Sequence, residues 1–485
     1  MCASFNVLDC RWIPVIGIDG SRQLLGIRET LAKADKLLEI SDPAPHEEFS
    51  VYRFLGLFLM DAIRPADDDE IIELYDSGTF NMDVIERYID ECQSEGVSFD
   101  LFDKTKPFLQ SVYDEKIDKS QKSITSIDCT SPSGNNHTHF CHASPLKYAP
   151  DRAVKLMLAT YWFCTAAAQE YPSGVYGAPP YFGIIKGKNL FETLVSLLLP
   201  VDEIQNFDYE PVLWRRVMPV QPKKIVSKVS WLHGMLFPSR RISLVPDEEG
   251  NVVSVYICQG ENFKEKYWKD PYVTYRTVKG KLTTLLPKSD TPIWRNFCDI
   301  IDIPGSHASQ LLSLYRRIHN VKTVNITLYG IETNQAKYCS VCRHNLQLPF
   351  ELAEKSSVEL LFNCIQASQK LYDAIRQLIS KKNPKSKIKV VPESVVNSTL
   401  ERYDQQCERL FWNLCKKKLD NEDNRILYES YCISIADVAL FVYDELFVTL
   451  NLRAHDLAQS ELYRNILKKI GRELISQKDG INDNR

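Results

Sequence analysis

The sequence lacks the motifs of the commonest nucleotide-hydrolysing and metal-dependent enzymes. No GxxxxGK[ST] loop occurs in its 485 residues, so we expect any ATP hydrolysis to belong to a partner. There is no HExxH pair, and Cys339 and Cys342 form a CxxC pair without the second pair that a four-ligand zinc site needs. We therefore expect no enzyme activity, and keep a metal-dependent nuclease built on His137, His139 and His142 only as an alternative.

Long apolar runs and a secretory start are missing as well. The longest apolar candidate, from Leu190 to Pro200, is too short to cross a bilayer and contains Glu192. The first residues, MCASFNVLDCRWIPV, show no basic segment followed by an apolar core. We therefore expect a cytoplasmic protein in which the 14 cysteines are reduced thiols.

An excess of positive charge is also absent. The chain has 59 Lys and Arg against 63 Asp and Glu, which gives a net charge of −4. A free-standing DNA-binding domain is usually basic, so composition argues against that kind of protein. It does not exclude a subunit of a larger complex, because such a subunit can present a local basic surface on a neutral body.

The first 348 residues alternate between strand-like and helix-like stretches. Val51–Ile63 is apolar on most sides, which predicts a core helix that ends at Pro65. Residues 111–146 are polar and without periodicity, so we expect a long loop there. Residues 171–188 are rich in Gly, Pro and Tyr, and residues 225–285 alternate as strands do. This pattern predicts a mixed α/β domain over residues 1–348.

The pattern changes to helix alone from about residue 349. Four amphipathic stretches follow one another up to residue 485, which predicts a four-helix bundle over 349–485 and an α+β fold for the chain. The connection after the first of these stretches, SKKNPKSKIK, is strongly basic. It holds Lys381, Lys382, Lys385, Lys387 and Lys389.

Several short stretches of the sequence, in the same order, resemble those of a known family. They are FNVLDCRWIPV at the start, LGIRETLAKADKLLEISDPAPHEEFSVYRFL after it, FDLFDKTKPFLQ at 99–110, SGNNHTHF at 133–140, GKNLFETLVSLLL at 187–199 and WLHGMLFPSRRISL at 231–244, which we expect to be a strand pair. Over nearly the whole chain the sequence resembles the CasA family, the large subunit of the type I-E CRISPR Cascade surveillance complex.

The resemblance implies a fold and a task. The fold is a large mixed α/β N-terminal domain with a C-terminal four-helix bundle. The task is non-catalytic: to recognise the protospacer-adjacent motif in double-stranded target DNA, to help strand opening and R-loop formation, and to recruit a helicase-nuclease in trans. The implied partners are the CRISPR guide RNA and the other Cascade subunits, namely the backbone, small and 5′-handle-binding subunits.

Two loops are implied to reach the DNA. FKEKYW at 263–268 resembles the family's lysine-bearing loop, with Lys266 as the contact and Lys264 as the second choice. Minor-groove acceptors carry a degenerate code, so a lysine there gives loose specificity. PSGVYGAPP at 172–180 takes the place of the family's glycine loop, with Gly174 before Gly177, because glycine permits close backbone approach. The plain alternatives are solvated lysines and an ordinary turn.

Two further elements complete the implied interface. ETNQAKY at 332–338 resembles a hairpin wedge, with Gln335 at the tip and Asn334 beside it. Its polar tip would help offset the few kcal/mol that opening a base step costs, roughly as estimated for inserted side chains. The loop 131–143 resembles one that contacts guide RNA and neighbouring subunits, through Gly134, Asn135 and Asn136.

Two alternatives stay open beside this interpretation. Cys339 and Cys342 are read as cysteines one turn apart without metal, and we expect no cofactor; a zinc site would need partners from Cys129, His137, Cys141 and His142. The family's zinc spacing is not reproduced here. The chain could also be a structural scaffold of its complex that makes no groove contact, in which case loss of the Lys266 or Gln335 side chain would change nothing.

Overall fold

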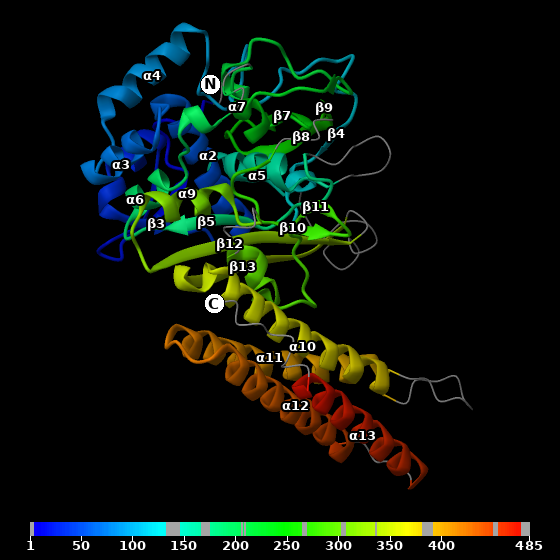
Figure 1. Cartoon of the computed structure of the whole chain (residues 1–485). Coiled ribbons are helices and arrows are strands. Elements are labelled where there is room, and N and C mark those ends of the chain that lie inside the picture. Colours follow the sequence, from blue (N-terminus) through cyan, green and yellow to red (C-terminus); the bar gives the residue numbers. More distant parts are fainter. Residues whose placement is uncertain are drawn as a thin grey trace. The chain divides into compact units, whose positions relative to one another are not determined.

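The computed structural model describes residues 4–131, 146–165, 175–204, 207, 210–263, 269–301, 307–334, 337–380, 391–449 and 454–476. The chain divides into two compact units. The N-terminal unit comprises Met1–Ser289 and Ala308–Gln347, and the helical unit comprises Asp290–His307 and Leu348–Arg485. Figure 1 shows both kinds of architecture, and each unit is described by itself.

Helix α2 (Pro45–Ile63) is the centre of the N-terminal unit. It starts with proline at its first position, where the missing N–H costs nothing, and it ends at Arg64, whose φ of 51° is left-handed. Sixteen of its 19 residues are buried. Its stretch Phe54–Met60 is apolar on every side, and such a helix must be enclosed. Helix α5 (Pro150–Phe163) packs along it. The predicted core helix is confirmed, and it begins six residues earlier than Val51.

The main sheet of this unit holds a long hairpin. Strand β12 (Thr323–Asn334) lies between β13 (Lys337–Pro349) and β5 (Phe182–Lys186), with Ile326 opposite Ile185. The aromatic ring of Phe49 on α2 stacks on Phe182 of β5 at a centroid distance of 4.5 Å. This aromatic contact joins the central helix to the sheet and is worth about 1 kcal/mol beyond the buried area.

Smaller elements surround this core. The further sheets are β2–β1–β3 (Arg22–Leu25, Ile13–Gly17, Leu37–Ile40), β4–β8–β7 (Gln121–Ser123, Val252–Gln259, Arg240–Pro246), parallel β6–β9 (Ile225–Val226, Asn262–Phe263) and β10–β11 (Tyr275–Val278, Lys281–Thr284). The further helices are α1 (Ile27–Ala32), α3 (Asp68–Ser77), α4 (Met82–Ser94), α6 (Leu190–Val195), α7 (Trp231–Met235) and α9 (Gln310–Ile318).

Two expectations about these elements need correction. The segment 231–244, expected as a strand pair, forms the short helix α7 followed by one strand, β7, because Ser230 caps the helix by accepting a hydrogen bond from the backbone N–H of His233. The loop expected at 111–146 contains strand β4, which pairs with β8. A strand as short as QKS has too few residues for its alternation to be visible in the sequence.

The helical unit is built from α10 (Lys355–Ile379), α11 (Glu393–Leu419), α12 (Asn424–Thr449) and α13 (Ala454–Ser476), which pack against one another. This confirms the α+β fold class with helices at the C-terminal end. The segment Asp290–His307, which includes α8 (Phe297–Ile301), belongs to this unit although the sequence pattern placed it in the first domain. Trp294 and Phe297 account for this, since their rings lie 5.3 and 5.5 Å from the ring of Phe411 on α11.

Helix α12 is unusually apolar. Its residues Asn424–Leu446 are long and apolar enough to cross a membrane, by length and composition alone, which the search for apolar runs in the sequence missed. Tyr431, Cys432 and Ile435 are buried among the neighbouring helices. The core helix of a bundle passes the same test, so this property indicates burial here and carries no membrane assignment.

Candidate nucleic-acid interface

Most of the predicted contact residues fall outside the described residues. This holds for Lys264, Lys266, Gly174, Gln335, Gly134, Asn135 and Asn136, and for the basic segment that contains Lys381 to Lys389. Asn334 and Gly177 are described and exposed.

Strand β13 and the end of α5 are in contact. The hydroxyl of Tyr338, on β13, donates to the backbone oxygen of Phe163 at 3.0 Å. Phe163 ends α5, and the side chain of Arg240 donates to the oxygen of Thr165 at 2.7 Å. Thr165 is the last described residue before the glycine segment. The start of β13 thus lies against the end of the helix that precedes the glycine segment.

The glycine and lysine segments meet at one apolar cluster. Val226, Val229 and Phe237 form its buried centre, and Val175 and Phe263 pack against it. Val175 is the first described residue of the glycine segment, and Phe263 is the first residue of the lysine segment. The rings of Phe237 and Phe263 lie 5.3 Å apart, edge to face. One described residue of each segment therefore packs on the same small core.

The loop expected to contact RNA is tied at both ends by Asp128. One carboxylate oxygen accepts from the backbone N–H of Thr130 at 2.9 Å, shortly before the loop. The other accepts from the hydroxyl of Tyr148 at 2.8 Å, shortly after it, and from Arg152 of α5 at 2.9 Å. Asp128 itself is 6% exposed, whereas the side chain of Arg152 is 42% exposed, and together these bonds join both ends of the loop to α5.

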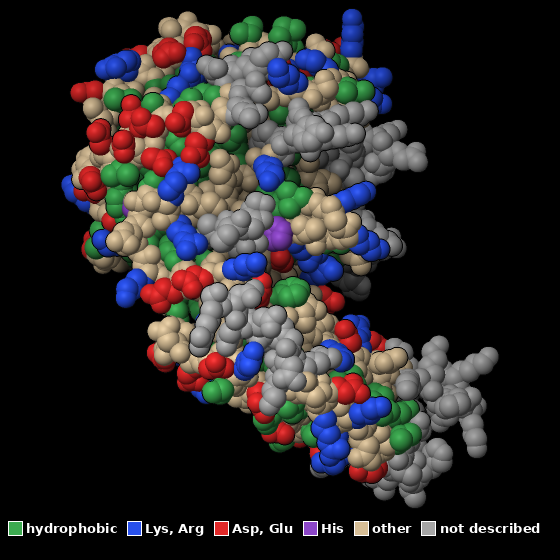
Figure 2. Space-filling model, in the orientation of Figure 1, with side chains coloured by type: hydrophobic (Ala, Val, Ile, Leu, Met, Phe, Trp, Pro, Cys, Tyr) green, Lys and Arg blue, Asp and Glu red, His purple; other side chains and the backbone are tan. Residues whose placement is uncertain are grey.

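The local sequence also supplies exposed positive charge that the motif search missed. Lys223, Lys224 and Lys228 flank β6 and are exposed. Strand β6 pairs with β9, and the backbone N–H of Asn262 donates to the oxygen of Lys224 at 2.7 Å. In the sequence these residues lie in the basic stretch QPKKIVSK, which resembles no known motif. Figure 2 shows Lys and Arg side chains gathered on the right of the N-terminal unit, whereas Asp and Glu gather at the upper left.

Family comparison gives the chain its identity. The model of the CRISPR-associated protein Cse1 family matches residues 6–439, which is most of the chain. The protein is a member of the Cse1 family. This confirms the resemblance to CasA, an alternative name that appears in the description of a solved Cse1 structure. A search of curated protein sequences found no significant match.

Solved structures agree with this family fold. Thermus thermophilus CasA (Cse1) is 21% identical, with a TM-score of 0.74 and coverage of 98% of this chain and 100% of that one. Thermobifida fusca Cse1 is 17% identical, with a TM-score of 0.75 and 98% coverage of both chains. A chain of a CRISPR RNA-guided surveillance complex is 16% identical, with a TM-score of 0.78 and coverage of 96% of this chain and 100% of that one.

The Cse1-family chain separates the two cysteines of its CxxC pair. Both lie on β13, where side chains alternate between faces, so residues three apart point in opposite directions. Cys339 is exposed, whereas Cys342 faces β12 with its Sγ 3.4 Å from the oxygen of Gly330. The expectation of two cysteines one turn apart is therefore wrong, because the segment is a strand. Among the described residues no group of three or more His, Cys, Asp or Glu could hold a metal ion.

Gly177 has a conformational reason to be glycine. Its φ of 71° lies in the left-handed region, which glycine adopts without a Cβ penalty. The residue is exposed and follows Tyr176 in a turn. The backbone conformation thus explains Gly177, independently of any approach to DNA, and Gly174 remains the first choice for a contact.

Buried charge beneath the loop base was not foreseen from the sequence. His46 and Glu47 of α2 are 1% and 2% exposed, and Lys155 of α5 lies 3.4 Å from Glu47. Burial raises the pKa of Glu47 to about 7 and lowers the pKa of His46 to about 4. Such residues read as surface charges in a single sequence, because nothing in their own pattern shows which helix will cover them.

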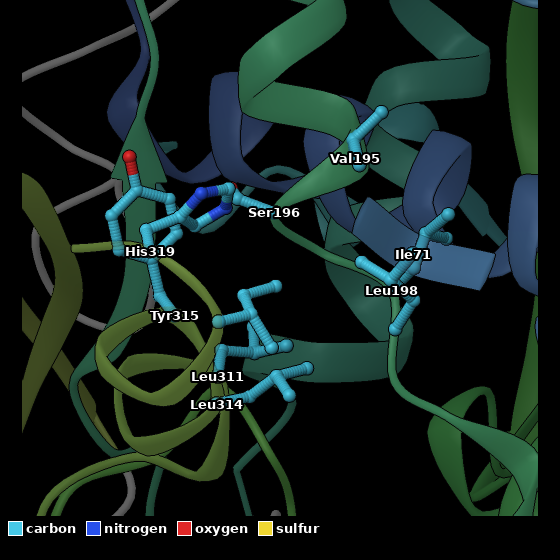
Figure 3. Close-up of a pocket in the computed structure, with 9 residues that line it drawn as sticks. Ile71, Val195, Ser196, Leu198, Leu311, Leu314, Tyr315 and His319 are labelled. Atoms are coloured by element: carbon cyan, nitrogen blue, oxygen red, sulfur yellow. The ribbon is translucent and has the colours of Figure 1, made fainter. Parts of the chain in front are cut away.

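A small pocket lies elsewhere in this Cse1-family protein. It encloses roughly 220 Å³ of space, partly open to solvent, between α3, α6 and α9. Figure 3 shows Tyr315 and His319 at one side of it and Ile71 and Leu198 at another. Its lining consists of Ile71, Val195, Ser196, Leu198, Leu311, Leu314, Tyr315, Ile318 and His319. The lining is mostly apolar, with Ser196, Tyr315 and His319 as its polar members.

Proposed function

We propose that this Cse1-family chain is the large, non-catalytic subunit of a type I-E CRISPR surveillance complex, which recognises the adjacent motif in duplex DNA through the minor groove. The observation that carries the proposal is the meeting of the glycine and lysine segments. Val175 of the glycine segment and Phe263 of the lysine segment pack on one apolar cluster. Tyr338, at the start of β13, bonds the end of α5, whose next residues are joined to β7 by Arg240. Loops on a rigid scaffold are where binding residues concentrate.

Each segment has a separate role in this proposal. Lys266, with Lys264 as second choice, and Gly174, with Gly177 as second choice, contact the minor groove. Gln335 and Asn334 form the wedge that helps strand opening and R-loop formation. Gly134, Asn135 and Asn136 contact the guide RNA or neighbouring subunits. Lys223, Lys224 and Lys228 add phosphate contacts, which strengthen binding without reading sequence.

The partners follow from the same proposal. Membership of the Cse1 family and the likeness to a chain of a CRISPR RNA-guided surveillance complex support assembly with guide RNA and the other subunits of such a complex. A helicase-nuclease is recruited in trans and supplies the cleavage that this chain does not perform. The complex works in the cytoplasm, where it meets invading duplex DNA.

The deciding experiment measures binding of a target duplex by the complex reconstituted with guide RNA and the other subunits. Lys266→Ala should weaken binding by about tenfold, the equivalent of roughly 1.4 kcal/mol for one lost groove contact. Assembly, followed by size-exclusion chromatography, should not change. Lys188→Ala is the matched control, because Lys188 is an exposed lysine beside α6 whose side chain is 89% accessible.

The alternatives give different results in the same experiment. If the Lys266→Ala and Gln335→Ala complexes both bind the duplex as the unchanged complex does, the chain is a scaffold without motif reading. If the purified chain cuts DNA with a divalent metal and stops when a chelator is added, the metal-hydrolase alternative is correct instead. Weaker binding by Lys266→Ala with normal assembly supports the proposal.

A further inference from the structure

Arg53 lies in the middle of α2 and is fully enclosed. Its residue exposure is 1%, and its guanidinium carbon lies 5.4, 5.3 and 5.0 Å from the ring centroids of Trp162, Phe182 and Tyr272. A charge without water is costly unless an opposite charge and hydrogen bonds compensate it. The buried guanidinium of Arg53 therefore needs partners that compensate its charge.

Asp270 is the group that compensates this charge. Its Oδ2 lies 2.6 Å from Nη1 of Arg53, and both side chains are buried. The same carboxylate accepts hydrogen bonds from the hydroxyl of Tyr176 and, at 2.9 Å, from the backbone N–H of Tyr272. The backbone N–H of Asp270 donates to the hydroxyl of Tyr275 at 2.9 Å. We call Arg53, Asp270 and Tyr176 the Asp270 clamp.

The place of the clamp in the chain gives it a consequence. Asp270 follows the lysine segment by two residues, and Tyr176 lies within the glycine segment, two residues after Gly174. Arg53 also donates from Nη2 to the backbone oxygen of Met235 at 3.1 Å, which anchors the clamp to α7. One buried arginine thus ties the chain just after the lysine segment and a residue of the glycine segment to the same central helix.

We propose that the Asp270 clamp is a positioning device, which fixes the lysine and glycine segments relative to each other so that they engage the duplex as one unit. The inference rests on the proposed function. Arg53, Asp270 and Tyr176 touch no DNA in it; they act through the segments they hold. Ends that are fixed before binding lose less conformational freedom on binding, and this raises affinity. Charge-assisted bonds in a dry interior suit that task, because few other arrangements satisfy the same groups.

Tyr176→Phe tests the clamp with the smallest change. It removes one hydroxyl and keeps the ring, which packs edge to face on Phe182 at 5.6 Å. The reconstituted complex should assemble normally and bind the target duplex about three- to tenfold more weakly, as expected for loss of a hydrogen bond to a charged group. Tyr161→Phe is the control: Tyr161 is a buried tyrosine whose hydroxyl donates to the oxygen of Leu109 at 2.7 Å, and neither residue belongs to the two segments.

A double-mutant cycle separates positioning from general stability. If Tyr176 acts through the lysine segment, Tyr176→Phe should cost less affinity once Lys266→Ala has removed the contact, so the two changes should be less than additive. Tyr161→Phe should give no such coupling. Asp270→Asn, which keeps the shape and removes the charge, should weaken duplex binding more than Tyr176→Phe does.

The outcomes keep the two proposals apart. Equal duplex binding by Tyr176→Phe and Tyr161→Phe, or full additivity with Lys266→Ala, would overturn the clamp; the proposed function would stand as long as Lys266→Ala itself weakens binding. If Lys266→Ala has no effect, the lysine segment contributes nothing, and the proposed function and the clamp fail together. If Asp270→Asn does not fold, Tyr176→Phe and Tyr275→Phe still decide, because each loses a single hydroxyl.

Discussion

His46 and Glu47, adjacent at the start of α2, are both withdrawn from water but respond to burial in opposite ways. Burial disfavours the charged form of each, which raises the pKa of the Glu47 carboxyl to about 7 and lowers the pKa of the His46 imidazole to about 4. Asp42, Asp128, Arg152 and Lys155 are the charged groups facing them. These residues underlie the base of the loop tied by Asp128, so their protonation bears on the stability of that region.

The two pKa shifts give stability contributions of opposite sign. The folded pKa of Glu47 lies above the ordinary value of 4.5, so the folded state holds the extra proton and the free energy of unfolding falls as pH rises from 4.5 to about 7. The folded pKa of His46 lies below 6.5, so the unfolded state holds the extra proton and the free energy of unfolding rises from pH 4 to about 6.5. Between pH 4.5 and 6.5 the two slopes oppose each other.

Single substitutions should isolate the pH dependence that each residue gives to the free energy of unfolding. Relative to the unchanged protein, the free energy of unfolding of His46→Gln should fall by about 3 kcal/mol as pH rises from 4 to 6.5, because the contribution of His46 is lost. That of Glu47→Gln should rise by about the same amount, relative to the unchanged protein, as pH rises from 4.5 to about 7. Urea unfolding at several pH values measures both. The double variant should restore a flatter profile, and two single-variant profiles parallel to that of the unchanged protein would contradict the assignment.

Element α12 illustrates which parts of the fold the sequence could predict. The four C-terminal helices were recognisable because apolar residues recur with helical spacing over long stretches. The buried face of α12 was not, because the helix is apolar nearly all round: Phe441 is 56% exposed, whereas Tyr443, two residues later, is fully buried. Periodicity predicts that a helix exists, and contacts distant in sequence decide which side is covered.

The candidate site shows the same division. Strand β12 ends at Asn334 and β13 begins at Lys337, both within the motif ETNQAKY. The Arg53–Asp270 pair joins residues more than two hundred positions apart, and neither belongs to a motif. Cys339 and Cys342 looked like a possible pair only because their spacing was read without the strand that separates them. Short sequence motifs predict single strands, helices and turns. Contacts between residues far apart in sequence are known only from the folded structure.

Phe411 on α11 provides the stability test for the helical unit. The residue is fully buried, and its ring contacts Trp294, which joins Asp290–His307 to the helices. Phe411→Ala should lower the free energy of unfolding of this unit by about 3–5 kcal/mol, the usual cost of emptying a buried aromatic site. Far-UV circular dichroism during urea unfolding measures the loss.

The matched control for this prediction is Phe441→Ala on α12. Because Phe441 is more than half exposed, its loss should cost less than about 0.5 kcal/mol. Equal destabilisation by the two substitutions would mean that Phe411 does not lie in the core of the unit.

At the scale of the whole molecule, the net charge of −4 conceals a local asymmetry. Residues 67–95, which include α3 and α4, contain 11 Asp or Glu and one basic residue, Arg87. The rest of the chain therefore carries a net charge of +6. Figure 2 shows the acidic side chains gathered at the upper left, where Figure 1 places these two helices. Net charge alone thus says little about DNA binding, because a duplex meets one face and not the average.

Five further lysines lie in the sequence from Lys381 to Lys389, between α10 and α11. They are outside the described residues. Their replacement by Gln should lower the affinity of the reconstituted complex equally for duplexes with and without the correct adjacent motif, because phosphate contacts carry no sequence information. Each lost phosphate contact should also reduce the slope of log affinity against log salt concentration by about 0.9.

Fluorescence-anisotropy titrations at several salt concentrations measure that slope, with Lys416, Lys417 and Lys418 at the end of α11 replaced by Gln as a control for the loss of charge alone. Loss of charge anywhere on the molecule weakens its long-range attraction for DNA, whereas each direct phosphate contact that is lost lowers the total number of counterions released on binding. The two sets should therefore differ in slope and not merely in affinity. An unchanged slope in the five-lysine variant would show that this segment is a solvated connection between α10 and α11 that does not touch the phosphate backbone.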